Sequence, residues 1–390
     1  MLVYLDHNAT TPLAPEVLEA VVRAQRDLWG NPSSPHALGL AARRALEEAR
    51  AQVAALLSVA PEEVIFTSGG TESDNAAVLG VAEARPDRRH VVISAVEHAA
   101  VAEPARRLRE RGWRVSVVPV LPSGVLDLEA LGAALTADTA LVSVIHAQNE
   151  TGVLQPIAEV AARAHDVGAV VHTDAAQSVG KVPLDVPALG VDLLTVAGHK
   201  VYAPKGIGAL IVRQGTPFRR VLEGAGHEGG RRAGTENVAG AVGLGVACAL
   251  ALREGEERGR RLAARRDRLE RELRARFPDA VVHGSGAPRL PNTLSIALPG
   301  IEAWKLLADL RDVVAASAGA ACHSSGAHVS PVLAAMGVPP ELALGTLRFT
   351  TGKDTSEADV DAAVTAIAAW AQTRAMSASA KDPSSAGIQR

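Results

Sequence analysis

The sequence predicts an α/β protein: a mostly parallel sheet covered by helices, followed by a smaller α+β domain. Two observations predict this class. Short apolar runs alternate with amphipathic stretches over the first two-thirds of the chain, and the polar clusters all follow apolar runs. In parallel sheets ligands bind beyond the carboxyl ends of the strands, so we expect these clusters to converge on one crevice. With 390 residues, the chain is long enough for more than one domain.

Seven apolar runs are the expected strands of the large sheet. Helical patterns separate several of them, such as the one over 158–167, and this alternation is typical of parallel strands. The runs are Val64–Thr67, His90–Ser94, Val115–Val120, Ala140–His146, Ala169–Asp174, Leu193–Val196 and Ala209–Val212.

A long helix rich in Arg and Glu, roughly 243–277, is expected to lead out of this sheet. Beyond it, strand-like segments at 293–297 and 347–349 and a helix-like segment at 302–310 predict the smaller α+β domain. The last fifteen residues are rich in Ser, Ala and Lys, which predicts disorder. The expected division is a large domain over 14–255, a small domain over 1–13 and 256–375, and a disordered tail over 376–390.

The composition excludes several classes of function. Acidic and basic residues nearly balance, 43 against 40, for a net charge of −3, so neither nucleic acid nor an anionic membrane is expected as the main partner. The N-terminus lacks the pattern of a signal peptide, and no stretch has the roughly 20 apolar residues of a membrane span. Two cysteines, Cys248 and Cys322, are too few for a disulfide framework and should be free. We therefore expect a soluble, cytoplasmic protein.

One segment carries the most chemical information: V-V-H-T-D-A-A-Q-S-V-G-K (Val170–Lys181), followed by L-L-T-V-A-G-H-K (Leu193–Lys200). It places Asp174 at the end of one expected strand and Lys200 at the end of the next. Pyridoxal phosphate (PLP) requires such a pair, because a buried carboxylate keeps its ring nitrogen protonated and a lysine amine holds its aldehyde as a Schiff base. An isolated Asp and Lys are more often unrelated residues of an ordinary α/β protein, so the assignment depends on the rest of the chain.

A phosphate site is expected at V-I-F-T-S-G-G-T-E-S-D-N-A-A-V-L-G (Val64–Gly80), which reads as a strand, a Gly-rich turn and the start of a helix. Gly69 and Gly70 allow close backbone approach, Thr71 offers a hydroxyl, and the N–H groups of the helix start favour an anion. The segment is neither G-x-G-x-x-G nor a P-loop with a lysine. A dinucleotide or nucleoside triphosphate site is therefore disfavoured.

Nine motifs occur in a fixed order along the chain: Y-L-D-H-N-A-T-T-P, G-N-P-S-S-P-H, F-T-S-G-G-T-E-S-D-N, V-E-H, N-E-T-G, H-T-D-A-A-Q, G-H-K, R-R-A-G-T-E-N and G-A-A-C-H-S. Together they resemble the cysteine desulfurases, which are class V, fold type I PLP enzymes. The resemblance extends from about Tyr4 to Ala368. It implies a large domain with a mostly parallel seven-stranded sheet and a smaller α+β domain.

The resemblance also implies roles for the residues around the cofactor ring. Lys200 matches the Schiff-base lysine and Asp174 the partner of the pyridine nitrogen. Gln177, one helical turn beyond Asp174, can reach the ring hydroxyl, and Asn149 in N-E-T-G lies near that oxygen and the substrate carboxylate. His98 in V-E-H matches the histidine that stacks on the ring and moves protons; the alternative is a histidine that merely caps a helix.

Gly70, Thr71 and His199 match positions that bind the cofactor phosphate. Thr235, in R-R-A-G-T-E-N, matches a threonine that the partner subunit supplies, which implies a homodimer with composite active sites. The chain departs from the family at Ala197, where a serine usually donates its hydroxyl to the phosphate. One hydrogen bond is worth roughly 0.5–1.5 kcal/mol, so its loss should weaken cofactor binding without abolishing it.

The remaining expected chemistry lies in the small domain. Cys322 sits among Gly, Ser and Ala, which predicts a mobile loop, and the resemblance makes it the thiol that receives sulfur. Arg348 matches the arginine that binds the substrate carboxylate, with an exposed strand arginine as the alternative. Cys248, on a helical pattern, is expected in the core. A zinc site of Cys322, His323 and His328 is disfavoured because no second ligand pair accompanies it, so no metal is expected.

The implied reaction converts L-cysteine to L-alanine. Lys200 removes the α-proton, and Cys322 takes the sulfur as a persulfide. An acceptor then receives it, such as an iron–sulfur scaffold protein or a tRNA-thiolation or cofactor pathway. Three alternatives stay open: a selenocysteine lyase, a class V aminotransferase that needs no loop thiol, and a non-catalytic PLP-binding protein.

Overall fold

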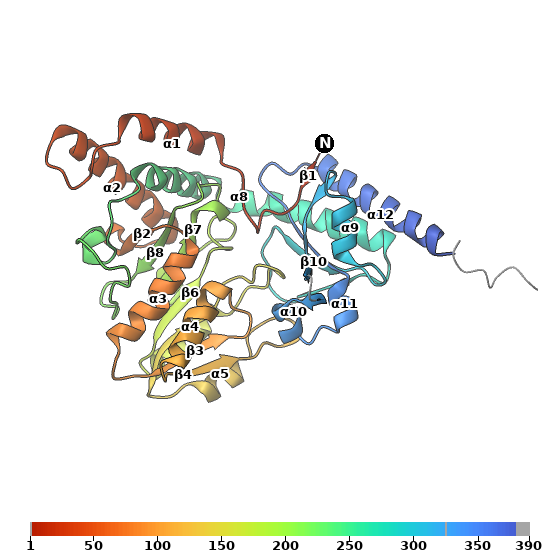
Figure 1. The fold of residues 1–390 in the computed structure, drawn as a ribbon, viewed down its shortest axis with the longest axis horizontal. Helices are drawn as coiled ribbons and strands as arrows, with labels where there is room; N and C mark the ends of the chain where they lie inside the picture. Colours follow the sequence, from red (N-terminus) through yellow and green to blue (C-terminus); the bar gives the residue numbers. More distant parts are fainter. Residues whose placement is uncertain (1, 324–325, 380–390) are drawn as a thin grey trace, which may run out of the picture. The chain divides into compact units, whose positions relative to one another are not determined.

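The structure is a computed structural model that describes residues 2–323 and 326–379, with the backbone alone for 320–323, 326–328 and 375–379. The chain divides into two compact units, each with its own sheet (Figure 1). The larger unit contains residues 8–260 and 284–291, and the smaller unit contains those up to His7, 261–283 and from 292 onward. The larger unit therefore begins earlier and ends later than the expected large domain, and it includes the segment 284–291.

The larger unit contains a seven-stranded sheet, as the sequence predicted. The spatial order is β2-β8-β7-β6-β5-β3-β4; β8 runs antiparallel to both of its neighbours, and the other pairs are parallel. Every strand except the edge strand β4 is buried along its whole length, which is why these segments read as continuous apolar runs. The strands are β2 (Val64–Thr67), β3 (His90–Ser94), β4 (Arg114–Val118), β5 (Thr139–Ser143), β6 (Val170–Asp174), β7 (Leu193–Ala197) and β8 (Gly208–Val212).

Helices cover both faces of this sheet, because neighbouring residues of a buried strand point to opposite faces. Leu194 of β7 belongs to a core cluster with residues of α2, α6 and α8, whereas Leu193 belongs to a second cluster with residues of α3 and α4. The helices are α1 (Pro15–Asp27), α2 (Ala37–Leu57), α3 (Gly70–Ala84), α4 (Ala99–Glu110), α5 (Leu128–Ala134), α6 (Ile157–Asp166), α7 (Val186–Leu189) and the first part of α8 (Val238–Arg276).

Helix α8 is long and apolar enough over part of its length to match a membrane span by composition. Of that apolar window, 61% is buried inside the protein, where Leu244, Ala247 and Cys248 pack in the core of the larger unit. Burial of this kind is typical of a core helix. The helix is interrupted at Gly255, whose φ of 49° and ψ of −136° suit glycine.

The smaller unit has the predicted α+β character. Its four-stranded antiparallel sheet has the order β12-β15-β10-β9, and its core joins β10 and β15 to α12 and the end of α8. The elements of this sheet are β9 (Val281–Val282), β10 (Thr293–Ala297), β12 (Ser317–Ala318) and β15 (Thr346–Thr350). Around it lie β1 (Val3–Tyr4) paired with β11 (Val314–Ala315), and the helices α9 (Ala303–Asp309), α10 (Pro331–Ala335), α11 (Pro340–Leu344) and α12 (Glu357–Ser379).

One expectation for the smaller unit is refined and another is corrected. The segment around Cys322, predicted as a mobile loop, contains an antiparallel hairpin of β13 (Ala320–His323) and β14 (Gly326–Val329), with Cys322 opposite Ala327, and its mobility stays a prediction. Residues 376–379, the predicted start of the disordered tail, continue α12, because its Ala- and Met-containing end still favours helix. The rest of that predicted tail, 380–390, lies outside the described residues.

Candidate active site

The Gly-rich turn after β2 forms a cradle at the start of α3. Gly69, the residue before the helix, has a φ of +150°, and the backbone of Gly208 in β8 lies so close that a Cβ there would be 2.7 Å from the Gly69 Cα. A Cβ on Gly70 would lie 3.2 Å from that of Ala197. The first N–H groups of α3, including those of Gly70 and Thr71, have no acceptor within the helix. This geometry suits an anionic phosphate.

His199 and Lys200 follow β7 in a short 3₁₀ turn, Gly198–Lys200. The Nδ1 atom of His199 lies 3.1 Å from the Thr10 hydroxyl. Burial lowers the pKa of His199 to about 4, and the charges of Lys200, Lys205 and Lys181 add to this effect. His199 is therefore a neutral imidazole at pH 7, able to donate one hydrogen bond to an anion.

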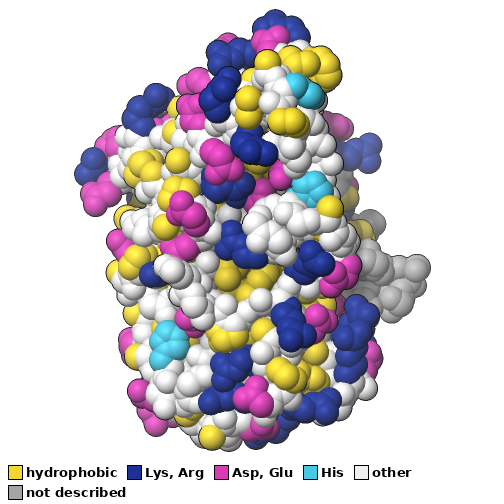
Figure 2. All heavy atoms as spheres, turned by 90° about the vertical axis from the view of Figure 1, so that its left-hand side faces the viewer, with side chains coloured by type: hydrophobic (Ala, Val, Ile, Leu, Met, Phe, Trp, Pro, Cys, Tyr) yellow, Lys and Arg dark blue, Asp and Glu magenta, His cyan; other side chains and the backbone are white. Residues whose placement is uncertain are grey.

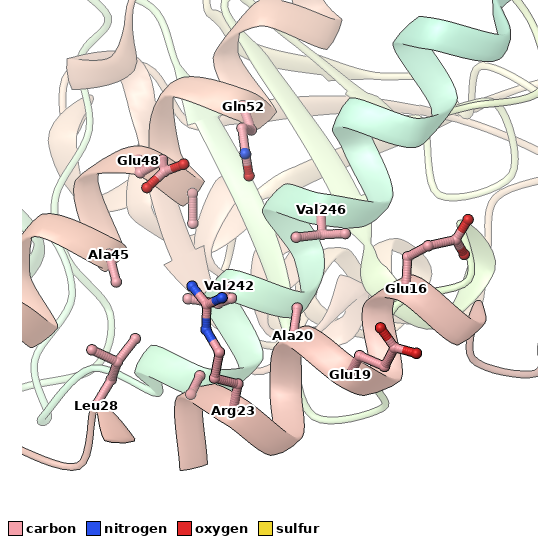
Figure 3. A pocket seen from close by; sticks show the side chains of 12 residues that line it. Glu16, Glu19, Ala20, Arg23, Leu28, Ala45, Glu48, Gln52, Val242 and Val246 are labelled. Carbon is pink, nitrogen blue, oxygen red and sulfur yellow. The ribbon is translucent and has the colours of Figure 1, made fainter. Parts of the chain in front are cut away.

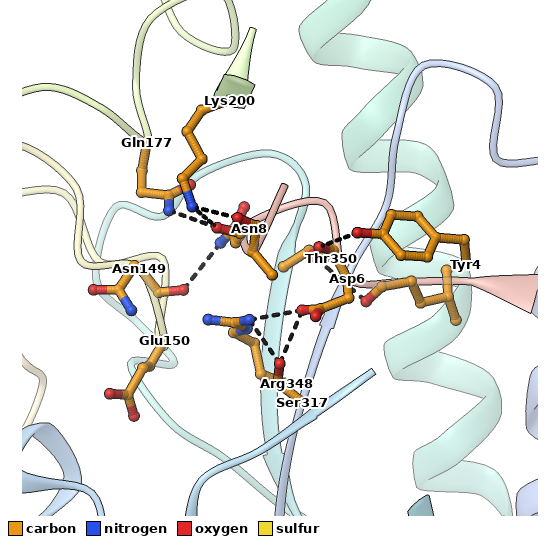
Figure 4. Close-up of polar contacts among 12 residues, drawn as sticks. Tyr4, Asp6, Asn8, Asn149, Glu150, Gln177, Lys200, Ser317, Arg348 and Thr350 are labelled. Atoms are coloured by element: carbon orange, nitrogen blue, oxygen red, sulfur yellow. Dashed lines mark hydrogen bonds and ion pairs between the residues drawn. The ribbon is translucent and has the colours of Figure 1, made fainter. Parts of the chain in front are cut away.

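The Lys200 amine is held by backbone oxygens. Its Nζ donates to the carbonyl oxygen of Asn8 and to that of Ala9, 2.8 Å away (Figure 4). The same Asn8 oxygen accepts a hydrogen bond of 3.0 Å from the Gln177 Nε2. A second lysine, Lys181, donates to the Gln177 Oε1 at 3.0 Å and to the Asn8 Oδ1 at 3.2 Å.

Asn8 also connects this group to Asn149, which follows β5. The Asn8 Nδ2 donates to the Asn149 carbonyl oxygen at 3.0 Å (Figure 4). The Asn149 Oδ1 accepts from the Gln148 Nε2 at 3.2 Å. Asn8 is only 1% exposed. Its backbone and side chain therefore join Lys200, Gln177, Lys181 and Asn149 into one network.

Asp174 ends β6 as a buried carboxyl group. Its Oδ1 accepts a hydrogen bond of 2.8 Å from the Ala176 N–H. Burial raises the pKa of Asp174, while the Ala176 bond and the charges of His98 and Lys200 oppose that rise. A cationic group next to this carboxyl would favour its ionised form.

Two further carboxyl groups, which the sequence did not single out, lie near Asp174. The pKa of Asp74 in α3 is raised well above its usual value by burial and by Asp174. Burial also raises the pKa of Glu97, to about 8, although Glu97 accepts hydrogen bonds from Ser94 and from the Ile145 N–H at 2.9 Å. The Asp74 Oδ1 and the Glu97 Oε2 are buried and have no hydrogen-bond partner among the described residues.

His98 precedes α4, and its Nδ1 accepts a hydrogen bond of 3.1 Å from the Ala100 N–H. His98 therefore does cap α4. This hydrogen bond also fixes the tautomer, because a neutral imidazole that accepts at Nδ1 carries its proton at Nε2. One ring nitrogen of His98 and one carboxyl oxygen each of Asp74 and Asp174 lie within 4.8 Å of one another. His98 thus both caps α4 and lies beside the carboxyl groups.

These residues fit PLP. The buried Asp174 carboxyl group beside His98 suits a protonated ring nitrogen, the Gly70 and Thr71 cradle suits a phosphate, and the Lys200 amine suits an aldehyde. The larger unit gathers eight of the predicted residues at the carboxyl ends of β2, β3, β5, β6 and β7. They are Gly70, Thr71, His98, Asn149, Asp174, Gln177, His199 and Lys200.

Thr235, also in the larger unit, is exposed. It lines a pocket of about 200 Å³ together with Ser68 and Arg232, and the Arg232 guanidinium pairs with Glu72 at 2.8 Å. The role of Thr235 toward a partner subunit stays a prediction.

In the smaller unit, Arg348 is not an exposed strand arginine. It lies in β15 with its side chain 11% exposed, and its Nη2 donates to the Asp6 Oδ1 at 2.6 Å and to the Ser317 Oγ at 2.8 Å (Figure 4). The Tyr4 hydroxyl donates to the Asp6 carbonyl oxygen at 3.1 Å. The side chain of Cys322 lies outside the described atoms, so its role stays a prediction.

Sequence reasoning missed Asn8, Lys181, Asp74, Glu97 and Asp6. Two signals could have found some of them. Asn8 and Asp6 belong to the Y-L-D-H-N motif, and Lys181 follows Gln177 by four residues, the spacing of neighbours on a helical face.

The chain is similar to known proteins of one family. The Aminotransferase class-V family matches residues 3–363. The chain is 46% identical over 361 residues to a cysteine desulfurase of Trichormus azollae, and 45% identical over 361 residues to the cysteine desulfurase NifS of Azotobacter vinelandii; each alignment covers 92% of this chain and 90% of the relative.

Among solved structures, a NifS-like protein aligns with a TM-score of 0.89 at 35% identity, over 96% of this chain and 100% of its own. Another solved structure, described as SspA in complex with cysteine, aligns with a TM-score of 0.78 at 30% identity, over 89% of this chain and 98% of its own. The similarity therefore extends over nearly the whole chain. The protein belongs to the class-V aminotransferase family and, within it, to the PLP-dependent cysteine desulfurases.

Proposed function

We propose that this cysteine desulfurase converts L-cysteine to L-alanine and passes the sulfur, as a persulfide on Cys322, to an acceptor protein for iron–sulfur cluster or thio-cofactor synthesis. The observation that carries the proposal is the placement of Lys200, Asp174 and the Gly70 cradle after the carboxyl ends of β7, β6 and β2, at one edge of the same sheet. The solved relative SspA, described in complex with cysteine, supports the substrate.

PLP, when bound, supplies an electron sink that makes the α-proton of the substrate removable. Gly70, Thr71 and His199 would hold its phosphate. Asp174 would face its ring nitrogen, and Gln177 its ring oxygen.

The chain's own residues would then perform three tasks. Arg348 binds the substrate carboxylate, for which its planar guanidinium is suited. Lys200, held beside the Asn8 and Ala9 carbonyl oxygens, accepts the α-proton. The Cys322 thiolate attacks the substrate sulfur; a sulfur–sulfur bond forms, the carbon–sulfur bond breaks, and its electron pair stays on the β-carbon, which gains a proton. Return of a proton from Lys200 to the α-carbon then completes alanine.

The test measures alanine release from L-cysteine and the absorption of the bound cofactor. Lys200→Ala should lose both. Cys322→Ala should keep the absorption of the cofactor and lose alanine release, because the sulfur then has no acceptor. Cys248→Ala is the matched control, since this thiol is buried in the core and should cost only some stability.

Unchanged alanine release by Cys322→Ala would disprove the persulfide step. Loss of L-cysteine turnover with retained turnover of selenocysteine would instead favour a selenocysteine lyase. Release of a keto acid that depends on an amino acceptor would favour an aminotransferase.

The second part of the proposal is a homodimer, in which Thr235 completes the partner's phosphate site. Large hydrophobic side chains are exposed on α1 and around the start of α2: Leu18, Val22, Trp29, Leu38 and Leu40. Figure 2 views the side on which the α1–α2 turn lies in Figure 1, and hydrophobic side chains are exposed there among charged ones. Exposed apolar surface of this kind often marks an interaction site.

A groove of about 420 Å³ between α1, α2 and α8 adjoins this region, with Ala20, Val242 and Val246 along it and Glu19 and Glu48 at its sides (Figure 3). A partner's side chains could enter such a groove.

Sedimentation at micromolar concentration tests the dimer. Val22→Glu should give a monomer that retains PLP poorly, whereas Leu252→Glu, on α8 and equally exposed at 51% against 55%, should stay dimeric. A fully active wild-type monomer would contradict the composite site. The proposed compartment is the cytoplasm, which cell fractionation tests.

A further inference from the structure

Lys181 is a second lysine in this site, and neither the sequence motifs nor the proposed reaction gives it a task. It is 8% exposed, although lysine side chains are rarely buried without a partner. Its ammonium lies 3.0 Å from the Gln177 Oε1 and 3.2 Å from the Asn8 Oδ1. Burial of this cation at the cofactor residues therefore needs an explanation.

The backbone places Lys181 and Gln177 side by side. After β6 the chain forms helical turns, with hydrogen bonds from the Val179 N–H to the Ala175 carbonyl and from the Val182 N–H to the Ser178 carbonyl. Gly180, between Gln177 and Lys181, has a φ of +72° and turns the chain between them, and the Lys181 ammonium hydrogen-bonds to the Gln177 Oε1. This contact holds Lys181 beside Gln177.

The chemistry of an ammonium gives this contact a direction. A lysine side chain has three donors and no acceptor, whereas a glutamine amide can turn by 180° and present either its oxygen or its nitrogen. Beside Lys181, only the orientation with the Gln177 oxygen toward the lysine forms a hydrogen bond. The Gln177 NH₂ then points the opposite way, where it donates to the Asn8 carbonyl oxygen.

We propose that Lys181 is a positioning residue that holds the Gln177 amide with its NH₂ toward the ring oxygen of PLP and locks the Asn8 amide by the same means. The Asn8 Oδ1 faces Lys181, so its Nδ2 faces the Asn149 carbonyl oxygen, 3.0 Å away. One cation thereby fixes two amides that flank Lys200. The proposal rests on PLP binding at Lys200 and extends it.

A donor aimed at the ring oxygen stabilises its negative charge, and this reduces the attraction of that oxygen for a proton on the neighbouring nitrogen. Loss of the donor should therefore raise the pH midpoint at which the absorption of the bound cofactor changes. Lys200, Asp174, His98 and His199 also lie at the cofactor position, and the charges of Lys181 and Lys205 both contribute to the lowered pKa of His199. A variant of Lys205 therefore separates this charge effect from the effect of Lys181 on Gln177.

The experiment is a spectroscopic pH titration of the holoenzyme without substrate. Lys181→Met should raise the midpoint by about one pH unit. Lys181→Arg, which keeps a donor-only cation, should raise it much less and leave it close to the wild-type midpoint. Lys205→Met is the matched control: Lys205 is exposed and contributes at least as much as Lys181 to the lowered pKa of His199, but it is not bonded to Gln177. Lys205→Met should leave the midpoint within about 0.2 pH units of the wild-type value.

A second comparison separates positioning from charge. In a Gln177→Leu protein, Lys181→Met should shift the midpoint by less than half as much, because the amide it acts through is gone. Equal shifts in both backgrounds, no shift in either, or a shift by Lys205→Met as large as that by Lys181→Met would each overturn the proposal. The wild-type absorption band tests cofactor binding separately, so failure of that premise is distinguishable from failure of the Lys181 proposal.

Discussion

Glu228 offers the sharpest test of how this fold holds the segment that leads to Thr235. Its carboxylate is 2% exposed and binds the Arg50 guanidinium through two contacts of 2.7 and 2.9 Å, while the Phe66 N–H donates to it at 2.9 Å. Arg50 also donates to the Val64 carbonyl oxygen at 2.9 Å. The pair thus ties this segment to α2 and to the sheet strand β2.

The matched control uses the same arginine. Arg50 has a second carboxylate partner, Glu47, at 3.1 Å, but the Glu47 side chain is 55% exposed. Removal of one partner from a buried ion pair costs about 3–5 kcal/mol, because the other charge stays buried, whereas an exposed pair is worth about 0.2–1 kcal/mol. Glu228→Gln should therefore destabilise the protein several times more than Glu47→Gln.

Glutamine is the right replacement at this position. Glu228 has a φ of +49°, which is uncommon for a residue with a side chain, and Gln carries the same backbone cost as Glu. Only the charge and part of the acceptor capacity change. A substitution to Gly would relieve the backbone at the same time and confuse the two effects.

Urea unfolding at fixed protein and saturating PLP concentrations measures the difference as a shift of the midpoint. The double variant Arg50→Met, Glu228→Leu should recover part of the loss, because it removes both charges and keeps apolar volume. If Glu228→Gln shifts the midpoint no more than Glu47→Gln does, the buried pair is not a main stabilising contact and this reasoning fails.

Three further predictions follow from buried groups. Burial raises the pKa of Glu97 from 4.5 to about 8, so the stability that it contributes is fully present below pH 4.5 and is lost progressively between pH 4.5 and 8; Glu97→Gln should flatten the fall of the apoenzyme's urea midpoint over that range. Ala197→Ser should lower the dissociation constant of PLP by about 2- to 12-fold, the equivalent of one hydrogen bond, and an unchanged constant in equilibrium dialysis would contradict it. Burial raises the pKa of Cys248 to about 12, so a Cys322→Ala protein should react with a thiol reagent at pH 8 only after unfolding.

Much of the large sheet could be predicted because strands buried on both faces are continuous apolar runs. The antiparallel direction of β8 was not predicted, although the chain contains a signal for it. Only residues 198–207 separate β7 from β8, and a parallel crossover needs a dozen or more. The hairpin around Cys322 was missed for a different reason: Gly, Ser and Ala are poor predictors of strand, and pairing between β13 and β14 decides the structure.

The site was predictable where its residues share one local segment, as Asp174, Gln177 and Lys200 do. Contacts between distant segments left no such signal: Asn8 meets Lys200 across 192 positions, and Asp6 meets Arg348 across 342. The carboxyl groups near Asp174 were hidden because burial, not residue type, gives them their raised pKa values.

The charges of the larger unit's site are divided in a way that suits the proposed reaction. Asp74 and Glu97, the two carboxyl groups whose pKa values are raised, lie near Asp174, where the ring nitrogen of the cofactor must stay protonated. Lys200, in contrast, is held by the neutral carbonyl oxygens of Asn8 and Ala9. A carboxylate partner would stabilise its ammonium and oppose release of the amine, whereas carbonyl oxygens hold its position at a smaller electrostatic cost to deprotonation. The charge of Lys200 also favours the ionised form of Asp174, so the division concerns the direct hydrogen-bond partners of each group and the charges stay coupled.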